Sequence, residues 1–558
     1  MSSVRSDEEG FWQCATGHVF FDRQIALRVA EPICHIEPPG APGVTCGLVC
    51  TWIPKEKPGV KNVFVAKPPI EFAKFDTIEE AVRAQPKFDE ILLIKGGVVI
   101  DPTSRHPIRE ADVLIVNGKI HAVGSGVTWT RPNLRTIDAT GMLVMPGLVD
   151  LHVHFREPGT EGETIATGVE AAVAGGFTTV CVMPNTNPAI DSRERVEWQR
   201  ETAALYGKAR VHVVGALTVG RAGKEVDASL LNAMVKGGAV AFSDDGNGVA
   251  DAGLMRKAML LAADLGIPIS DHAEDSCLAG AGLVSLGEIS VALGIPGKPA
   301  IAEEAMIARD IELARATGAH LHVAHLSTAR GVELVRRAKH EGLHVTAEVT
   351  PHHLILNEKH LVLDPKTDPK IDTNKKMNPP LRREHDNAAL WAGLLDGTID
   401  AIATDHAPHP ESKKALGIFD APNGVTGLET AFSVLYTRTR AMGLTPRPMS
   451  PVRMVELLST GPARLFNLQG GSLRPGSPAD VAIVDGDAEW RVYGPDMRSQ
   501  SKNTPFEGQW LHGKTAYTIV GGKVVYERQG VTHATPTVLM HRAREWALSF
   551  CVECGEKH

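Results

Sequence analysis

The chain is 558 residues long, which is enough for a large barrel with appended modules, and its 43% hydrophobic and 22% charged residues are typical of a globular enzyme. Its 58 lysines and arginines against 66 aspartates and glutamates give a net charge of −8 without a long run of one sign, which argues against nucleic acid or a membrane surface as the main partner. No apolar stretch approaches the length of a membrane span, and the first residues lack the apolar core of a signal peptide, so we expect a cytoplasmic protein.

Residues 1–90 are rich in proline and glycine and show no sustained hydrophobic period, so we interpret them as an N-terminal extension of unknown role. Six of the eight cysteines lie in this extension or in the C-terminal tail at residues 531–558, namely Cys14, Cys34, Cys46, Cys50, Cys551 and Cys554. Disulfides are not expected in the cytoplasm. The irregular cysteine spacing fits either a structural zinc site or free thiols, with free thiols favoured, and it assigns no ligands.

Strand-like runs with glycine-rich turns between them begin at residue 91. They have a counterpart near the other end of the chain. Residues 111–116 (ADVLIV) resemble residues 479–484 (ADVAIV), and residues 96–99 (GGVV) resemble residues 521–525 (GGKVV). We therefore predict one composite β domain that is built from residues 91–146 and 468–530.

Between residues 147 and 467, strand-like and helix-like stretches alternate. Eight strands are predicted at residues 148–154, 177–183, 210–217, 239–243, 267–272, 320–325, 343–350 and 399–404. Helices are expected between most of them, for example at residues 163–174, 251–265, 301–317 and 328–341. Eight alternating units favour an α/β fold of the parallel (β/α)8 TIM-barrel type. A doubly wound open sheet is the alternative, which is weakened because no phosphate-binding glycine motif follows a first strand.

The first predicted barrel strand ends in His152-Val153-His154. Residues two apart in a strand point to the same face, so the two imidazoles can share a metal ion, and zinc favours such ligands. Taken alone, however, the pair is better explained by one core histidine and a coincidence.

Histidine and aspartate recur at the ends of other predicted barrel strands. They are Asp244 and Asp245 after the fourth, Asp271 and His272 at the fifth, His325 at the sixth, and Asp405 and His406 at the eighth. Active sites of (β/α)8 barrels lie at the C-terminal ends of the strands. Each histidine by itself could be a hydrogen-bonded core residue, but the whole set predicts a site for two divalent metal ions that share a bridging carboxylate.

These residues stand in stretches that resemble the motifs of dihydroorotases in the amidohydrolase superfamily, and most closely those of the bacterial type I group. The stretches are DLHVHFREPG at 150–159, MPNT at 183–186, FSDDG at 242–246, DHAED at 271–275, HVAHLS at 322–327, VTPHH at 349–353, KMNPP at 376–380, IATDHAPH at 402–409 and SKNTPF at 501–506. The resemblance covers roughly residues 91–530 and implies an amidohydrolase-type barrel with a flanking β domain. It also implies the interconversion of (S)-dihydroorotate and N-carbamoyl-L-aspartate in pyrimidine biosynthesis.

Carried over position by position, the resemblance assigns His152 and His154 to the more buried zinc ion and His272 and His325 to a second one. It implies one or two zinc ions per subunit, with two favoured. Many superfamily members bridge the metals with a carboxylated lysine on the fourth strand, where this chain has no lysine. The type I group has an aspartate in that role, which corresponds to Asp245, and the adjacent Asp244 is the rival.

The resemblance further places Asp405 at the metal as the general base, which takes a proton from the metal-bound hydroxide and gives it to the departing ring nitrogen. Arg156, Asn185, Asn378 and His409 match substrate-binding positions. A bidentate arginine suits the carboxylate of the substrate. For Asn185, Asn378 and His409 the alternative is a turn residue, since Asn185 and Asn378 stand beside prolines and could simply shape loops.

Two other functions compete with this one. A hydantoinase or allantoinase would be expected to carry the lysine on the fourth strand, and the sequence FREPG at residues 155–159 disfavours a hydantoin substrate. A non-catalytic scaffold for aspartate transcarbamoylase would have lost metal ligands that this chain retains. We expect a homo-oligomer that acts on a small molecule, and association with aspartate transcarbamoylase is compatible with activity.

Overall fold

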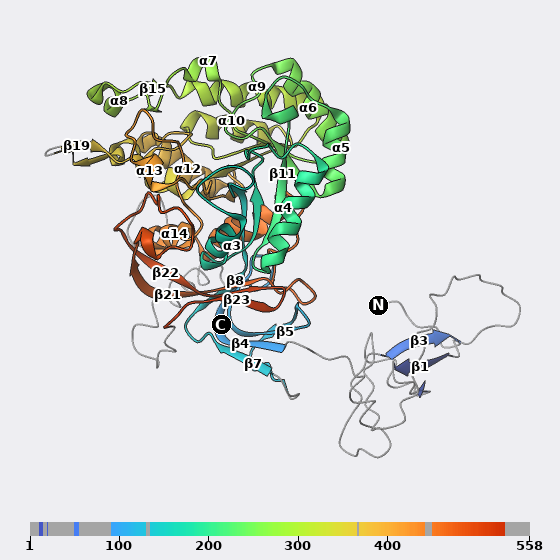
Figure 1. Ribbon diagram of the computed structural model, residues 1–558. Coiled ribbons are helices and arrows are strands. Elements are labelled where there is room, and N and C mark those ends of the chain that lie inside the picture. Colours follow the sequence, from blue (N-terminus) through green and yellow to red (C-terminus); the bar gives the residue numbers. More distant parts are fainter. Residues whose placement is uncertain are drawn as a thin grey trace, which may run out of the picture. The chain divides into compact units, whose positions relative to one another are not determined.

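The computed structural model describes residues 91–129, 134–364, 368–440 and 449–530, together with the backbone of three short strands near the N-terminus (Figure 1). The chain divides into two compact units, Met1–Pro86 and Lys87–His558. In the first unit, β1 (Gly10–Cys14) pairs with β2 (Val19–Phe20) and β3 (Cys50–Pro54) in an antiparallel sheet. The side chains of the six cysteines predicted as zinc ligands or thiols lie outside the described residues, so that question stays open.

The larger unit is organised around a sheet of eight parallel strands in the order β20-β17-β16-β13-β12-β11-β10-β9. The strands are β9 (Leu148–Val153), β10 (Phe177–Val182), β11 (Arg210–Ala216), β12 (Ala239–Ser243), β13 (Ile269–Asp271), β16 (Leu321–Val323), β17 (Val345–Val349) and β20 (Ala401–Ile402). The first and last strands meet through a parallel bridge between Val153 and His406. The sheet therefore closes into the predicted (β/α)8 barrel, and the open-sheet alternative is wrong.

Helices separate the barrel strands, and Figure 1 shows them wrapped around the strands. They are α3 (Ile165–Ala174), α4 (Arg193–Tyr206), α5 (Ala228–Gly237), α6 (Ala252–Leu265), α9 (Ile301–Thr317), α10 (Ala329–His340), α12 (Glu384–Asp396) and α14 (Ala431–Arg440). Five of them begin at a side chain that accepts a hydrogen bond from the first turn: Thr164, Ser192, Asp227, Asp251 and Thr328. The predicted positions of α3, α6, α9 and α10 are confirmed to within two residues.

Shorter elements lie in the connections between the barrel strands and in the segments that follow β20. They are η1 (Val219–Arg221), α7 (Ser276–Ala279), β14 (Val284–Ser285), α8 (Glu288–Leu293), β15 (Gly297–Lys298), α11 (Pro351–Ile355), η2 (Glu358–Leu361), β18 (Val362–Asp364), β19 (Asp368–Ile371), η3 (Thr373–Lys375), α13 (Glu411–Lys414), α15 (Pro451–Val455), η4 (Glu456–Thr460), α16 (Gly461–Leu465) and η5 (Gly494–Asp496). Among the described residues, no helix combines the length and apolar character needed to span a membrane.

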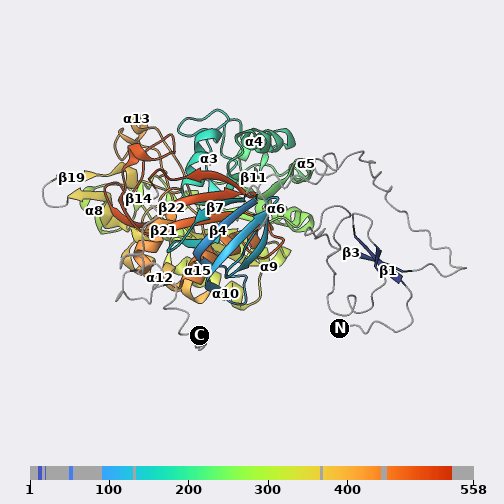
Figure 2. The same cartoon turned by 90° about the horizontal axis from the view of Figure 1, so that it is seen from below.

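A second sheet joins strands from both sides of the barrel segment in the order β23-β22-β21-β8-β4-β5-β6, with β7 paired to β4. Its strands are β4 (Ile91–Ile100), β5 (Ile108–Val116), β6 (Lys119–Gly124), β7 (Leu134–Asp138), β8 (Leu143–Pro146), β21 (Val481–Arg491), β22 (Trp510–Val520) and β23 (Lys523–Glu527). The antiparallel pairing of β8 with β21 connects the two halves. Figure 2 shows strands of this sheet in the foreground of the larger unit. The flanking β domain is therefore confirmed, while the boundaries at residues 146 and 467 stay predictions.

The β domain is fastened to the barrel by an ion pair between Asp480 and Arg210. The buried carboxylate of Asp480 accepts from Nε and Nη2 of Arg210, on β11, at 3.0 and 3.1 Å. It also accepts from the backbone nitrogen of Gly521 at 2.7 Å. One side chain thus joins three segments that are distant in the sequence.

We expect Asp480→Ala to lower the free energy of unfolding by about 2 kcal/mol, because it removes charge-assisted hydrogen bonds and leaves a backbone donor without its acceptor. The measurement is urea unfolding followed by circular dichroism. The matched control is Glu527→Ala, which removes an ion pair with Arg135 in which both side chains are more than half exposed. That control should lower the free energy of unfolding by about 0.5 kcal/mol or less. Equal losses of stability in the two variants would contradict the role of Asp480 in fastening the β domain to the barrel.

Candidate metal centre

The six predicted metal ligands all lie at the C-terminal ends of barrel strands and are buried. His152 is in β9 and His154 follows it, Asp245 follows β12, His272 follows β13, His325 follows β16 and Asp405 follows β20. His325 and Asp405 have positive φ angles of 33° and 47°. Non-glycine residues in that region are strained, and such strain collects at functional sites. The backbone therefore turns sharply where these two side chains enter the cluster.

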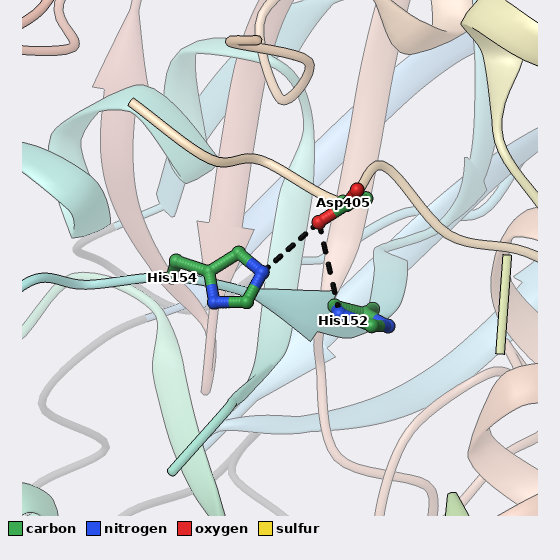
Figure 3. Close-up of side chains that lie close together, drawn as sticks. All are labelled: His152, His154 and Asp405. Carbon is green, nitrogen blue, oxygen red and sulfur yellow. Dashed lines mark hydrogen bonds and ion pairs between the residues drawn. The ribbon is translucent and has the colours of Figure 1, made fainter. Parts of the chain in front are cut away.

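Two groups of potential ligands share His152. One consists of His152, His154 and Asp405, drawn in Figure 3, in which Asp405 Oδ1 lies 2.9 Å from His154 Nε2 and 3.7 Å from His152 Nε2. The other consists of His152, Asp245 and His325, in which Asp245 Oδ1 lies 3.3 Å from His152 Nε2 and 3.6 Å from His325 Nε2. The two carboxylates therefore lie against the same imidazole nitrogen.

His272 adjoins the second group. Its Nδ1 lies 2.9 Å from His325 Nε2 and 3.5 Å from Asp245 Oδ1. The other oxygen of Asp245, Oδ2, lies 3.6 Å from His154 Nε2. Asp245 therefore faces histidines of both predicted pairs, which is the position that a bridging carboxylate requires.

The donor set fits a divalent cation. Ligands bound tetrahedrally at 2.0–2.1 Å from one zinc ion lie about 3.3–3.5 Å apart, which is close to the separations in this cluster. His152 Nε2 is buried and, among the described residues, has no hydrogen-bond partner, although two carboxylate oxygens lie near it. An imidazole nitrogen that faces carboxylates without a hydrogen bond is well placed to bind a metal.

The electrostatics hold both aspartates in the ionised form that a metal ligand needs. Burial by itself would raise the pKa of Asp245, but the charges and hydrogen bonds of the histidines, with His152 first, outweigh it and bring this pKa well below its usual value. The pKa of Asp405 is lowered in the same way, with burial opposed chiefly by the hydrogen bond from His154.

The rival aspartate, Asp244, points away from the histidines and binds the connection after β11. Its Oδ1 accepts hydrogen bonds from the backbone nitrogens of Leu217 and Thr218, each at 2.9 Å, and its Oδ2 accepts one from the Thr218 hydroxyl. These donors belong to the connection after β11. Of the two adjacent aspartates, the structure therefore brings only Asp245 to the histidines.

Glu348, on β17, contacts the cluster from behind, and the sequence analysis missed it. Its Oε1 lies 3.0 Å from His152 Nδ1, its Oε2 lies 3.2 Å from His322 Nε2, and its side chain is 1% exposed. Burial would raise its pKa, but hydrogen bonds from His152 and His322 outweigh burial and lower the pKa to about 2. An ionised Glu348 accepts the Nδ1 proton of His152, which leaves Nε2 to face the cluster. The signal was a glutamate inside an apolar barrel strand, which needs a buried partner.

The four predicted substrate-binding residues surround the cluster. Asn185 contacts it directly, because its Oδ1 lies 2.8 Å from His154 Nδ1 and its Nδ2 donates to Asp245 Oδ2 at 3.2 Å. Arg156 donates from Nε to the carbonyl of Pro408 at 3.2 Å, and its Nη2 lies 3.3 Å from His409 Nε2. Asn185 thus contacts the predicted ligands directly, and Arg156 contacts another predicted substrate-binding residue.

Asn378 faces the cluster from the side of His272. Its Nδ2 lies 3.1 Å from His272 Nε2, and its Oδ1 accepts from Lys298 Nζ at 2.6 Å. Lys298 also donates to Glu274 Oε2 at 2.6 Å. The sequence analysis did not single out Lys298 or Glu274, and since neither follows a strand directly, only the structure shows that they fix the orientation of Asn378.

Phe155 anchors the segment that follows β9, between His154 and Arg156. Its ring is fully buried, and it packs so closely on Gly168 of α3 that a Cβ at Gly168 would lie 2.3 Å from the ring. Phe155 stands between His154 and Arg156 in the sequence. Its burial therefore fixes the backbone that aims both of these side chains at the rim.

Comparisons with known proteins agree with this geometry. The family described as "Dihydro-orotase-like" matches residues 141–331. The dihydroorotase of Pelotomaculum thermopropionicum is 45% identical over 437 residues, which are 78% of this chain and 98% of the relative. That of Anaeromyxobacter sp. strain K is 47% identical over 440 residues, again 78% of this chain and 98% of the relative. The chain belongs to the dihydroorotase family.

Solved structures of cyclic amidohydrolases share the fold of this dihydroorotase-family chain. The L-hydantoinase (dihydropyrimidinase) of Arthrobacter aurescens has a TM-score of 0.69 and 28% identity, covering 79% of this chain and 97% of its own. A D-hydantoinase (dihydropyrimidinase) of Thermus sp. has a TM-score of 0.67 and 26% identity, covering 78% and 94%. The resemblance to dihydroorotases is therefore confirmed, while the roles of the individual site residues stay predictions.

We expect Glu348→Gln to weaken metal binding about tenfold to a hundredfold, because an amide holds the Nδ1 proton of His152 less strongly than a carboxylate does. The measurement is competition for the metal with a chelator of known affinity. Asp480→Ala is the matched control, since it removes a buried, paired carboxylate away from the cluster and should leave metal affinity unchanged. Equal affinity in Glu348→Gln and the wild type would contradict this role.

Proposed function

We propose that the chain is a dihydroorotase, which hydrolyses (S)-dihydroorotate to N-carbamoyl-L-aspartate and also runs the reverse cyclisation, in the biosynthesis of pyrimidines. The observation that carries the proposal is a buried cluster of four histidines and two aspartates at the rim of a dihydroorotase-family barrel. Half-buried Arg156 lies beside it and forms no ion pair with an acidic side chain of the described residues. A cationic donor beside a metal centre suits a cyclic amide that carries a carboxylate.

We assign the cluster to two zinc ions. His152, His154 and Asp405 would hold one, His272 and His325 the other, and Asp245 would bridge them. A zinc ion bound in this way lowers the pKa of water and polarises a carbonyl group. The two groups of potential ligands that share His152, and the contacts of Asp245 with both histidine pairs, support this assignment.

Asp405 is proposed as the general base. Its lowered pKa keeps it ionised, so it can accept a proton from the water that attacks the ring amide carbon. As the carbon–nitrogen bond breaks, the same carboxyl gives its proton to the departing ring nitrogen. In the cyclisation direction these proton transfers run in reverse, and Asp405 takes the proton from the ureido nitrogen.

The substrate carboxylate is assigned to Arg156, with Asn185 and His409 beside it. Burial and the charge of Arg156 hold the pKa of His409 down to about 3, so its imidazole is neutral near pH 7 and can accept or donate a hydrogen bond. Asn378 is assigned to the ring on the side of His272. Its contacts with Lys298 and His272 support this place because they fix which amide atom faces which way.

A hydantoinase activity is the second candidate, since solved hydantoinases share the fold. The dihydroorotase relatives are more similar in sequence, at 43–48% identity against 24–28% for the hydantoinase structures. The fourth strand also ends in aspartates where a hydantoinase would be expected to carry lysine. A purely scaffolding role is disfavoured because all six predicted ligands lie together.

We further propose that the enzyme is a homo-oligomer of the cytoplasm that is able to associate with aspartate transcarbamoylase. The family resemblance supports these assignments. Sedimentation of the protein with and without that enzyme would test the oligomeric state and the association.

In an assay with purified protein, we expect interconversion of dihydroorotate and N-carbamoyl-aspartate and no turnover of hydantoin or allantoin. Asp405→Asn should lower kcat by about a hundredfold or more, because the amide cannot accept the proton. Asp420→Asn is the control, an exposed aspartate in the connection after the same strand, and it should keep full activity. Turnover of hydantoin but not of dihydroorotate would favour the second candidate.

Removal of the metal should abolish activity, since the water and the carbonyl would lose their activation. We expect a chelator to inactivate the enzyme, Zn²⁺ to restore it, and elemental analysis to find two zinc ions per chain. The metal-free protein should also unfold at a lower temperature, because a ligand that binds only the folded state stabilises it. Full activity in protein without bound metal would refute the assignment.

A further inference from the structure

The connection after β11 is built rigidly and presents an arginine at the rim of the site. Asp244 accepts hydrogen bonds from the backbone nitrogen of Thr218, at 2.9 Å, and from the hydroxyl of the same residue. Further along, the backbone nitrogen of Gly220 donates to Asp191 Oδ2 at 2.9 Å. The next residue is Arg221, whose φ of 57° lies in the left-handed region. The anchored backbone thus fixes an unusual conformation at this one position.

The guanidinium of Arg221 is only partly used by the protein. Its Nε is buried and has no hydrogen-bond partner among the described residues. Its Nη2 lies 2.9 Å from the side-chain oxygen of Asn247, in the amide orientation that satisfies both ends of that side chain. Arg221 forms no ion pair with an acidic side chain in the described part of the chain. A buried donor without an acceptor is costly, so it points to an absent partner.

The space beside Gly246 is bordered by hydrogen-bond donors. A Cβ built on Gly246 would have two neighbours within 4 Å, namely Arg221 Nη2 at 3.6 Å and Asn185 Nδ2 at 3.9 Å. Asn185 contacts His154 and Asp245 of the metal cluster. The space therefore adjoins the centre where the substrate is expected, and it offers two N–H groups to an oxygen ligand.

Two arginines approach the centre from neighbouring parts of the rim. β9, β10 and β11 are adjacent in the barrel, and the connections after them carry Arg156, Asn185 and Arg221. Neither guanidinium forms an ion pair with an acidic side chain of the described residues, and two such cations on neighbouring connections form a favourable site for an anion.

We propose that Arg221 is a second guanidinium for the carboxylate of the substrate, which it binds from the side opposite Arg156 with Asn185 between them. This inference rests on the proposed function, since it takes dihydroorotate as the ligand. Arg221 thereby sets specificity, because a neutral cyclic amide such as hydantoin gains nothing from a second cation.

The test compares Arg221→Gln and Arg221→Lys with the wild type in the metal-loaded enzyme. We expect Arg221→Gln to raise KM for dihydroorotate about tenfold to a hundredfold with kcat nearly unchanged, because it removes binding that ground state and transition state share. Arg221→Lys should recover part of the loss. The control is Lys224→Gln, an exposed cation of the same connection, which should leave KM unchanged.

Calorimetry with orotate and uracil, which differ by the carboxylate, tests the role of Arg221 independently of turnover. Orotate should bind Arg221→Gln at least about tenfold more weakly than the wild type, with uracil binding unaltered. If the wild type binds orotate but does not turn over dihydroorotate, the proposed function fails while this binding comparison still decides the role of Arg221. Unchanged KM and orotate affinity in Arg221→Gln, or a loss of metal or thermal stability in both variants, would overturn the inference.

Discussion

The candidate metal centre depends on one constraint. Ionised side chains that are buried in a barrel must find partners of opposite charge and hydrogen-bond partners among one another. Asp245 and Asp405 face His152 from the rim, while Glu348 holds the opposite nitrogen of the same imidazole. Carboxylates removed from water are costly unless they are paired and hydrogen-bonded. His152 is therefore the partner that two carboxylates require and, in the proposed metal centre, also a nitrogen donor to the metal ion.

Barrel closure makes this arrangement possible. The backbone nitrogen of His154 donates to the carbonyl of His406 at 2.9 Å, which brings the end of β9 next to the segment after β20. Asp150 reinforces the contact, because its Oδ1 accepts from the backbone nitrogens of His152 and Thr404 at 3.1 and 3.0 Å. Burial raises the pKa of Asp150 to about 7 despite these hydrogen bonds. The first and last strands thus meet next to His154 and Asp405, two of the proposed metal ligands.

Around the centre, neighbouring charged side chains make different kinds of contact. Asp244 and Asp245 are adjacent in the sequence, yet one shapes the connection after β11 and the other faces the histidines. Arg156 and Arg221 lack acidic side-chain partners among the described residues, whereas Lys298 is paired with Glu274 and orients Asn378. In the proposed function, the two arginines without acidic partners bind the substrate carboxylate, and Lys298 holds the proposed binding residue Asn378 in place.

The barrel, the composite β domain and the set of candidate ligands were predictable from the amino-acid sequence. Alternation of strand and helix predicts the barrel, and the end of each strand is fixed by local pattern, so His152, His154 and Asp405 could be placed at one rim. Short-range pattern could not separate Asp244 from Asp245, because their difference depends on which way the chain turns after β12 and on the donors of Thr218. It could not reveal Glu348 or Arg221 either, since each acquires its role from residues that are distant in the sequence. Only the closed tertiary structure brings those partners within hydrogen-bonding distance.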